Sequence, residues 1–286
     1  MCFNGDIRSS ESIVGGTEKT MHVIVCIKQV PDSTKISIDP VTKTLMREGV
    51  ESILNPFDEY ALEVALRIKD EKGARVTVVS MGPPQATVII REALARGADD
   101  GVLLSDRAFA GADTLATAYA LTTAIQKINP RPDLVLFGKQ AIDGDTAQVG
   151  PGVSEDLGFP LVTYVRDLKI ADDGTYTVET VMDAGIDVLE GKLPAVMTVV
   201  KEAAVPRFAT LSGWVRAKRA PVTVWTAKDT GADPARLGLN GSPTKVVDTF
   251  PPPVKTGGRV VDASKDPAAG VAAIVALMKE KKLGVA

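Results

Sequence analysis

The sequence predicts an α/β fold: a doubly wound, mostly parallel sheet with added antiparallel strands and a C-terminal arm that ends in a helix. Short apolar runs alternate with helical patterns from residue 21 to about residue 151, and this alternation is typical of parallel strands joined by helices. After Pro160, strand-like segments follow one another without helices between them, which favours extra strands at one side of the sheet. From residue 229 onward Gly, Pro and Thr are frequent, which favours an extended arm.

The expected elements of the first half alternate between strand and helix. Strands are expected at residues 22–27, 75–81, 102–104 and 134–137, and helices at 56–73, 86–95 and 114–128. Asn55 is the expected N-cap of the first helix, Pro56 its first residue and Gly73 its end. Asp39-Pro40 lies between two short segments that indicate a small hairpin. A sheet built in this way binds its ligand beyond the carboxyl ends of its strands.

The second half predicts three strands, a basic segment and a terminal helix. Strands are expected at residues 162–170, 176–182 and 195–200, and an irregular loop with a short basic helix at 207–219. Asp266 caps the terminal helix, whose apolar stripe is Val271, Ile274, Val275 and Met278. An isolated helix cannot bury such a stripe, so we expect it to pack on another subunit. The predicted domains are a disordered extension at 1–20, an α/β domain at 21–228, and the arm and helix at 229–286.

Composition and charge exclude several classes of function. The chain has 286 residues, of which 45% are hydrophobic and 24% charged, as in ordinary globular proteins. Its net charge of −3 argues against nucleic-acid binding. His22 is the single histidine and Cys2 and Cys26 are the two cysteines, so we expect no metal centre, disulfide framework or Ser-His-Asp triad. Any redox chemistry must then reside in a cofactor.

The sequence carries no signal that directs the chain to a membrane. The apolar runs are shorter than a membrane-spanning helix requires. Residues 1–20 lack the apolar centre of a signal peptide, and their acidic residues disfavour a transit peptide. We therefore expect a cytoplasmic protein without direct membrane insertion.

The stretch from Gly138 to Pro151 is the most informative part of the chain. It follows an apolar strand, and Asp143-Gly144-Asp145-Thr146 supplies a turn with short polar residues that we expect to cap a helix beginning at Asp143. A strand, a polar turn and a helix start together aim free N–H groups and a helix dipole at a phosphate. Gly144 lets the backbone approach a ligand closely, because it has no Cβ. An ordinary capped turn between a strand and a helix explains the same residues without a ligand.

Five segments of the chain resemble the β-subunits of electron-transfer flavoproteins and occur in the order of that family. They are Val25-Cys26-Ile27-Lys28, Asn55-Pro56-Phe57-Asp58, Ser80-Met81-Gly82-Pro83, Gly138 to Pro151, and Pro206-Arg207-Phe208-Ala209-Thr210-Leu211. The fourth is similar in particular to the form of the family with G-D-T-A-Q-V-G-P, which holds a second FAD. In the single-flavin form this loop is richer in carboxylates and holds AMP. The resemblance extends from Met21 to the terminal helix.

The resemblance implies a nucleotide site formed by strand ends and the loop after residue 137. The implied cofactor-binding residues are Cys26, Asn55, Asp58, Met81, Gly138, Lys139, Gln140, Ala141, Ile142, Asp143, Gly144, Asp145, Thr146, Ala147, Gln148, Val149, Thr163 and Tyr164. Cys26 and Met81 would border the adenosine, and Thr163-Tyr164 the isoalloxazine. We expect the N–H groups of residues 145–148 and the Thr146 hydroxyl to contact phosphate. The two carboxylates of the loop should turn away from it, because like charges repel.

Structural explanations compete with these assignments. Buried packing explains Cys26 and Met81. Helix capping explains Asn55 and Asp58, although Asn55 can cap and still face a ligand. The β-propensity of branched residues explains the segment around Thr163.

A separate site is implied at Leu211, an apolar residue in a polar and basic loop. In the family this leucine inserts into a pocket on the partner dehydrogenase. Trp214, Arg216, Lys218 and Arg219 follow it and suggest a charged rim around the anchor. The alternative is that Leu211 folds back onto its own domain.

The function implied by the resemblance is that of a β-subunit in a heterodimer with an electron-transfer flavoprotein α-subunit, of the electron-bifurcating type. In that type NADH reduces the FAD held mainly by this chain. One electron passes to ferredoxin or flavodoxin, and the other passes through the α-subunit FAD to an acyl-CoA dehydrogenase or a quinone-reducing partner. No side chain here is a candidate acid, base or nucleophile.

Two alternatives stay open from the sequence. One is a single-flavin shuttle whose β-subunit binds AMP structurally. The other is an adenine-nucleotide-binding signalling or stress module, against which the long arm and the terminal helix argue.

Overall fold

The computed structural model describes residues 20–32, 37–38, 45–46, 52–247 and 260–283. The chain divides into two compact units, Met1–Lys245 and Val246–Ala286, and each is described by itself. The predicted disordered extension and the centre of the predicted arm fall on residues 1–19 and 248–259, which lie outside the described residues.

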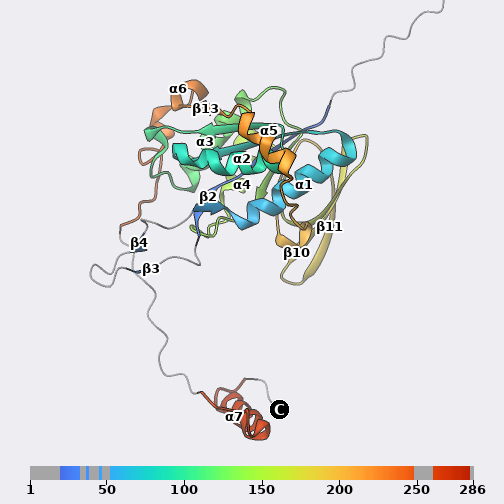
Figure 1. Ribbon diagram of the computed structural model, residues 1–286, viewed down its shortest axis with the longest axis vertical. Helices are drawn as coiled ribbons and strands as arrows, with labels where there is room; N and C mark the ends of the chain where they lie inside the picture. Colours follow the sequence, from blue (N-terminus) through green and yellow to red (C-terminus); the bar gives the residue numbers. More distant parts are fainter. Residues whose placement is uncertain (1–19, 33–36, 39–44, 47–51, 248–259, 284–286) are drawn as a thin grey trace, which may run out of the picture. The chain divides into compact units, whose positions relative to one another are not determined.

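A nine-stranded sheet forms the centre of the first unit, counted over the described residues (Figure 1). Its strands are β1 (His22–Cys26), β6 (Arg75–Met81), β7 (Asp100–Leu104), β8 (Leu134–Gly138), β9 (Leu161–Ile170), β10 (Thr175–Met182), β11 (Gly185–Lys192), β12 (Ala195–Val199) and β13 (Thr223–Trp225). Across the sheet they lie in the order β11, β10, β9, β12, β8, β1, β6, β7 and β13. Neighbouring strands from β9 across the sheet to β13 pair in parallel. At the opposite edge β10 pairs antiparallel with both β9 and β11. The expected fold class is confirmed.

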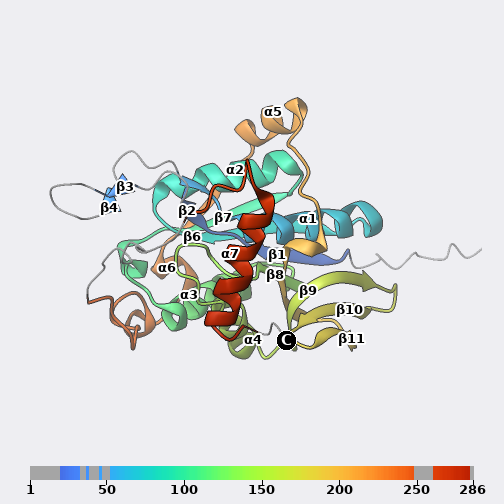
Figure 2. The ribbon, with the colours of Figure 1, turned by 90° about the horizontal axis from the view of Figure 1, so that it is seen from below.

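Helices cover both faces of the sheet, which is why its central strands are apolar along their whole length. One face carries α1 (Pro56–Lys72) and α2 (Thr87–Arg96), with α5 (Leu211–Arg219) beside α2. The other face carries α3 (Thr114–Lys127), α4 (Val149–Leu157) and α6 (Ala227–Thr230) (Figure 2). Every residue of β1, β8 and β12 is buried between these two layers.

The shorter elements lie mostly at the ends of the strands. The structure has 3-10 turns η2 (Pro84–Ala86), η3 (Arg107–Phe109), η4 (Lys201–Ala203) and η5 (Pro234–Arg236). Two antiparallel pairs join β2 (Gln29–Pro31) to β5 (Ser52–Leu54) and β3 (Ser37–Ile38) to β4 (Leu45–Met46). The second pair is the hairpin predicted around Asp39-Pro40, although these two residues themselves lie outside the described part of the chain.

The helix α1 forms as its sequence predicts at both ends. Pro56 occupies its first turn, and Gly73 ends it with a left-handed φ of 66° and an N–H that donates to the Lys69 carbonyl. Its apolar stripe is buried against the sheet. This helix positions much of the candidate site.

The sequence analysis did not predict β11. Each residue of this edge strand is exposed or half-buried, so no alternation of buried and exposed side chains marks it in the sequence. It is recognised only through its pairing with β10 along Gly185–Lys192.

The first unit also includes residues 229–245, which the sequence analysis placed in the arm. Leu237 is 2% exposed and belongs to the core on the α3 face. The Asp113 N–H donates to Ser242 Oγ at 2.8 Å, and Thr244 Oγ1 donates to the Asp113 carboxylate at 2.9 Å. Asp113 is the N-cap of α3, so these contacts tie the segment to the start of that helix.

The second unit contains the predicted terminal helix, α7 (Pro267–Glu280). Asp266 caps it by accepting from the Ala269 N–H at 3.1 Å, and Pro267 occupies the first turn as expected. Val271 and Ile274 of the apolar stripe are exposed within this unit.

The strand order reverses beside β1, and this decides where a ligand can bind. The chain proceeds from β1 through α1 and β6 to β7, and then returns through α3 to β8 on the other side of β1. The connection after β1 leads to α1 on one face, and the connection after β8 leads to α4 on the opposite face. In open α/β sheets the ligand crevice lies where two such connections separate. The fold therefore places the candidate site at the carboxyl ends of β1 and β8.

We expect Leu237→Ala to destabilise the first unit, because it removes buried apolar volume beneath α3. Substitutions of this kind cost about 2–5 kcal/mol. Leu239→Ala is the matched control, since Leu239 is exposed two residues later. Thermal melting should show a clear decrease for Leu237→Ala and little change for Leu239→Ala. Equal, small shifts would show that residues 229–245 do not belong to the first unit.

Candidate nucleotide-binding site

The loop between β8 and α4 begins at the point where the strand order reverses. The sequence analysis placed the start of the following helix at Asp143, and this was wrong, because α4 begins at Val149. Asp145 and Ala147 have left-handed φ angles of 52° and 54°, which an α-helix does not allow. The polar residues 143–146 thus do not cap a helix. The N-cap is Gln148, and no side chain makes a capping hydrogen bond there.

Close contact between the first turn of α1 and the end of β8 depends on Gly138. A Cβ at this position would lie 2.4 Å from Asp58 Oδ1 and 2.5 Å from the carbonyl carbon of Phe57. Both distances are far below van der Waals contact, so a larger residue would separate the helix from the strand. Gly138 therefore brings the α1 residues and the loop after β8 into one site.

The buried side chain of Asn55 holds the loop after β8. Its Nδ2 donates to the Gln140 carbonyl at 2.9 Å, and its Oδ1 accepts from the Ile142 N–H at 3.2 Å. Asn55 is the N-cap residue of α1, as expected, but its side chain makes no capping hydrogen bond to that helix. The amide is used instead to fix two backbone groups of the loop.

Asp58 lies buried in the first turn of α1, behind the loop. Its Oδ2 accepts from the Lys28 N–H at 2.8 Å. Burial raises the pKa of this carboxyl to about 7, although hydrogen bonds from Asn55 and from the N–H groups of Lys28 and Gly138 act in the opposite direction. The carboxyl joins the connection after β1 to the end of β8.

The two acidic residues of the loop are engaged by neighbouring groups of the chain. Lys28 Nζ lies 2.7 Å from Asp143 Oδ1 and 2.8 Å from Oδ2, an ion pair that joins the connections after β1 and β8. The Gln140 side-chain amide donates to Asp145 Oδ1. These contacts agree with the expectation that both carboxylates turn away from a phosphate. Lys28 was not among the predicted site residues, although it follows a predicted strand directly.

Three N–H groups at the end of the loop are free to bind an anion. Within the described part of the chain, those of Thr146, Ala147 and Gln148 have no acceptor. A left-handed residue followed by a right-handed one, here Ala147 and Gln148, turns successive N–H groups into one concave anion site. The Asp145 N–H was predicted to belong to this group, but it donates to the Ala141 carbonyl at 2.9 Å and is not free.

Cys26 and Met81 lie at the carboxyl ends of neighbouring strands, as expected. The Cys26 thiol is buried in the core on the α3 face, and its pKa is raised by burial and further by the charge of Asp58. Met81 is half-buried and packs against the same core. Both residues lie at the strand ends where the fold places the candidate site, and both also pack in the core.

Thr163 and Tyr164 form a bulge in β9 opposite Thr198 of β12. Two residues of β9 there face one residue of β12, Tyr164 has a φ of 57°, and its N–H donates to Thr198 Oγ1 at 3.0 Å. Bulges often direct side chains towards functional sites. Lys139, the first residue after β8, places its Nζ 5.4 Å from the centre of the Tyr164 ring. The bulge thus brings this part of β9 to the edge that carries the nucleotide loop.

Comparisons with known proteins agree with this geometry. A protein-family model described as "Electron transfer flavoprotein domain" matches residues 42–230. The chain belongs to the electron transfer flavoprotein family. It is 49% identical to the caffeyl-CoA reductase-Etf complex subunit CarD of Acetobacterium woodii, over 92% of this chain and 100% of the relative. It is 52% identical to the electron transfer flavoprotein subunit beta of Thermoanaerobacterium thermosaccharolyticum, over 84% and 92% of the two chains. Protein FixA of Azorhizobium caulinodans is 49% identical, over 81% and 85%.

These relatives identify the chain as an electron transfer flavoprotein β-subunit, which implies pairing with an α-subunit. The family also implies that the chain takes part in binding a flavin or another nucleotide. The free N–H groups, the fixed loop and the adjacent strand ends suit a ligand of that chemistry.

Leu211 of this β-subunit is the first residue of α5 and is 83% exposed, so it does not fold back onto its own domain. Of the residues expected to form a charged rim, Arg216 is exposed, and its Nη2 also donates to the Leu94 carbonyl at 2.6 Å and holds α5 on α2. Lys218 and Arg219 are exposed in the last turn of α5, and Trp214 is also exposed.

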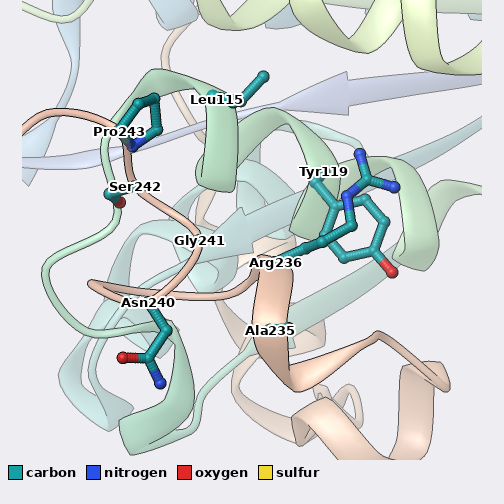
Figure 3. A pocket seen from close by; sticks show the side chains of 8 residues that line it. All are labelled: Leu115, Tyr119, Ala235, Arg236, Asn240, Gly241, Ser242 and Pro243. Atoms are coloured by element: carbon teal, nitrogen blue, oxygen red, sulfur yellow. The ribbon is translucent and has the colours of Figure 1, made fainter.

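A separate pocket of about 330 Å³ lies between α3 and residues 235–243 (Figure 3). The guanidinium of Arg236 lies across the Tyr119 ring at 3.7 Å from its centre. The pocket is lined by Leu115, Tyr119, Ala235, Arg236, Asn240, Gly241, Ser242 and Pro243. None of these belongs to the predicted nucleotide site.

Two other features are absent from the described residues. They contain no group of three or more His, Cys, Asp or Glu side chains that could hold a metal ion. They also contain no helix that is long and apolar enough to cross a membrane.

The raised pKa of Asp58 predicts a specific dependence of stability on pH. The pKa of Asp58 in the folded protein lies near 7, above the ordinary value near 4. The stability that this carboxyl contributes to the folded state is therefore fully present below about pH 4 and is lost as pH rises to about 7. Relative to Asp58→Asn, the unaltered protein should lose on the order of 3 kcal/mol of unfolding free energy between pH 5 and pH 8. Denaturant unfolding at the two pH values measures this difference.

Asp172→Asn is the control for this experiment. Lys72 holds the pKa of the exposed Asp172 carboxyl below its ordinary value, so this group is ionised throughout the same pH range. The difference in unfolding free energy between Asp172→Asn and the unaltered protein should be the same at both pH values. A pH-independent difference for Asp58→Asn as well would contradict the raised pKa.

Proposed function

We propose that this chain is the FAD-binding β-subunit of an electron-bifurcating electron transfer flavoprotein. The observation that carries the proposal is the group of free N–H groups at Thr146, Ala147 and Gln148 beside Gly144. The backbone at Gly144 is not left-handed, and an added Cβ would meet no protein atom within 4 Å. The fold therefore does not require glycine here, and the close approach of a diphosphate explains it.

The charges around the loop are consistent with a bound diphosphate. Lys28 neutralises the Asp143 carboxylate, and Gln140 binds the Asp145 carboxylate, so neither acid is an unbound charge at the anion site. The uncapped start of α4 adds the positive end of its helix dipole. These features support binding of the two phosphates of FAD, with the Thr146 hydroxyl as a further donor.

The isoalloxazine is proposed to lie towards the bulge of β9. Thr163 and Tyr164 are at that edge, and Lys139 brings a positive charge to it. A bound flavin supplies one-electron and two-electron chemistry, and the chain supplies its position, polar contacts and exclusion of water. Cys26, Asn55, Asp58 and Met81 are assigned to the walls or supports of the adenosine part.

One relative supports part of the proposed electron path. The name of CarD places that relative in a caffeyl-CoA reductase-Etf complex. We assign NADH as electron donor, ferredoxin or flavodoxin as one acceptor, and an α-subunit FAD as the other. The second electron then reaches an acyl-CoA dehydrogenase or a quinone-reducing partner, with Leu211 as the docking anchor and α7 packed on the α-subunit. The proposed location of the complex is the cytoplasm.

The alternative is a non-bifurcating shuttle in which the same loop holds AMP. Such a loop needs N–H donors for one phosphate only. It does not need space for a second phosphate at Gly144. Membership of the electron transfer flavoprotein family argues against the third hypothesis, a free-standing adenine-nucleotide-binding signalling module.

The cofactor content of the purified heterodimer tests the proposal. We expect acid extraction and chromatography to give two FAD and little AMP for each pair of α- and β-subunits. One FAD and one AMP would favour the non-bifurcating shuttle. Absence of any nucleotide from this chain would reject both.

Substitution of Gly144 tests the assignment of the diphosphate. Gly144→Asp places a carboxylate against the phosphates, so it should weaken FAD binding at least about tenfold, which corresponds to roughly 1.4 kcal/mol. Gly144→Ala is the control, because a Cβ there meets no protein atom and so tests the space available to the ligand alone. Fluorescence titration of the FAD-free heterodimer measures the affinity, and a melting curve checks folding. Equal FAD affinity in all three proteins would contradict this role of Gly144.

A further inference from the structure

The apolar residues at the proposed docking site lie on the segment that leads into α5 and on the first residue of that helix. Val205 is 90% exposed, Phe208 is 95% exposed and Leu211 is 83% exposed. We call residues 204–211 the docking segment. Residues 204–210 belong to no helix or strand. A segment without such regular structure needs other contacts to hold one conformation.

Arg207 provides such contacts, because its side chain lies against α1 while Phe208 beside it is exposed. Arg207 Nε donates to Glu63 Oε1 at 3.0 Å and to Oε2 at 2.9 Å, and Nη2 donates to Oε1 at 2.8 Å. The Arg207 backbone N–H also donates to Glu63 Oε2 at 3.0 Å. Glu63 is 6% exposed. Asp70, one further carboxylate of α1, lies 2.8 Å from Nη2.

The remaining contacts of this region hold its two ends. Before the docking segment, Arg67 Nη1 donates to the Ala203 carbonyl at 3.0 Å. After it, Arg91 Nη1 donates to the Ala217 carbonyl at 2.7 Å, and Arg216 holds α5 on α2. In the middle of the segment Ala209 packs against the core, and Arg207 makes the polar contacts, since its bonds to Glu63 fix both a side chain and a backbone N–H.

We propose that Glu63 and Arg207 are positioning residues, which hold the docking segment in one conformation so that Phe208 and Leu211 meet the partner dehydrogenase together. The inference rests on the proposed docking function of Leu211. A segment that is already ordered loses less conformational entropy on binding, so its affinity is higher. A buried ion pair is weak evidence for stability in itself, and its established use is to specify one arrangement.

The helix α1 gives this pair a second consequence. Asn55 and Asp58 at its first turn hold the nucleotide loop and the strand ends, and Glu63 is one to two turns further along the same helix. A single rigid element thus supports both the nucleotide site and the docking segment. The pair fixes the docking surface relative to the cofactor.

The test uses the heterodimer of this chain with its α-subunit. It compares Glu63→Gln and Arg207→Lys with a control variant at a second ion pair of α1. Both variants keep side-chain size, and they weaken or remove the bidentate contact. The control is Glu59→Gln, since Glu59 is also on α1 and its carboxylate pairs with Arg96 at 2.7 Å, not with a residue of the docking segment. Leu211→Ala is included because it removes the proposed anchor and leaves the pair intact.

The first measurement uses the heterodimer alone and does not require a dehydrogenase. Hydrogen–deuterium exchange of peptides that cover residues 204–211 should be faster by about tenfold in Glu63→Gln and Arg207→Lys, because local opening becomes easier by that factor. It should stay unchanged in Glu59→Gln and Leu211→Ala. Melting temperature and flavin content, measured on the same samples, identify variants that have lost the fold. Unchanged exchange in both variants would overturn the inference, whatever the docking results are.

The second measurement uses a butyryl-CoA dehydrogenase and crotonyl-CoA as the probe, with the photoreduced heterodimer as electron donor. Glu63→Gln and Arg207→Lys should raise the KM for the dehydrogenase by about tenfold and leave kcat unchanged, because only binding depends on preorganisation. Leu211→Ala should raise KM as well. If Leu211→Ala alone raises KM, the pair does not position the docking segment and the inference is wrong. If Leu211→Ala has no effect, the proposed docking function fails, and the inference fails with it.

Discussion

The candidate site depends on the close approach of the first turn of α1 to the carboxyl end of β8. Gly138 permits this approach, since a Cβ there would overlap the backbone of Phe57 and the carboxyl of Asp58. Asp58 is thereby buried between the ends of β1 and β8, and it accepts from the Lys28 N–H. The buried carboxyl is unfavourable for stability above neutral pH, since burial raises its pKa. The carboxyl lies where the strand order reverses, and groups with such perturbed pKa values are typical of binding sites.

The same approach leaves the outer part of the nucleotide loop free to bind a ligand. Asn55 uses both ends of its amide on the loop backbone, and Lys28 and Gln140 engage its two carboxylates. The loop is thus fixed from the protein side, while the N–H groups that follow Asp145 point to no acceptor within the described residues. An anion site that is already ordered binds with little loss of conformational entropy. The helix α1 extends this order to the docking segment through Glu63.

The sequence by itself determined the fold class and the family. Apolar runs that are buried on both faces and the capping residues of α1 and α7 are local signals, so they predict elements without tertiary information. The resemblance of five short segments identified the family, which the relatives confirm. The nucleotide loop was placed correctly after β8. The exposure of Leu211 agrees with its assignment as a surface anchor, although its docking role stays a proposal.

Only the tertiary structure decided which groups of the loop are free and which are engaged. The sequence suggested a helix from Asp143, whereas left-handed residues at 145 and 147 delay it to Val149, and backbone dihedral angles of non-glycine residues leave no mark in a sequence. Asn55 is the N-cap residue that its sequence context predicts, but its side chain binds groups that are 85 and 87 residues away in the chain. The pair of Glu63 and Arg207 is separated by 144 residues. Local sequence patterns report short-range interactions, and contacts of this range exist only once the sheet has brought α1, β8 and the docking segment together.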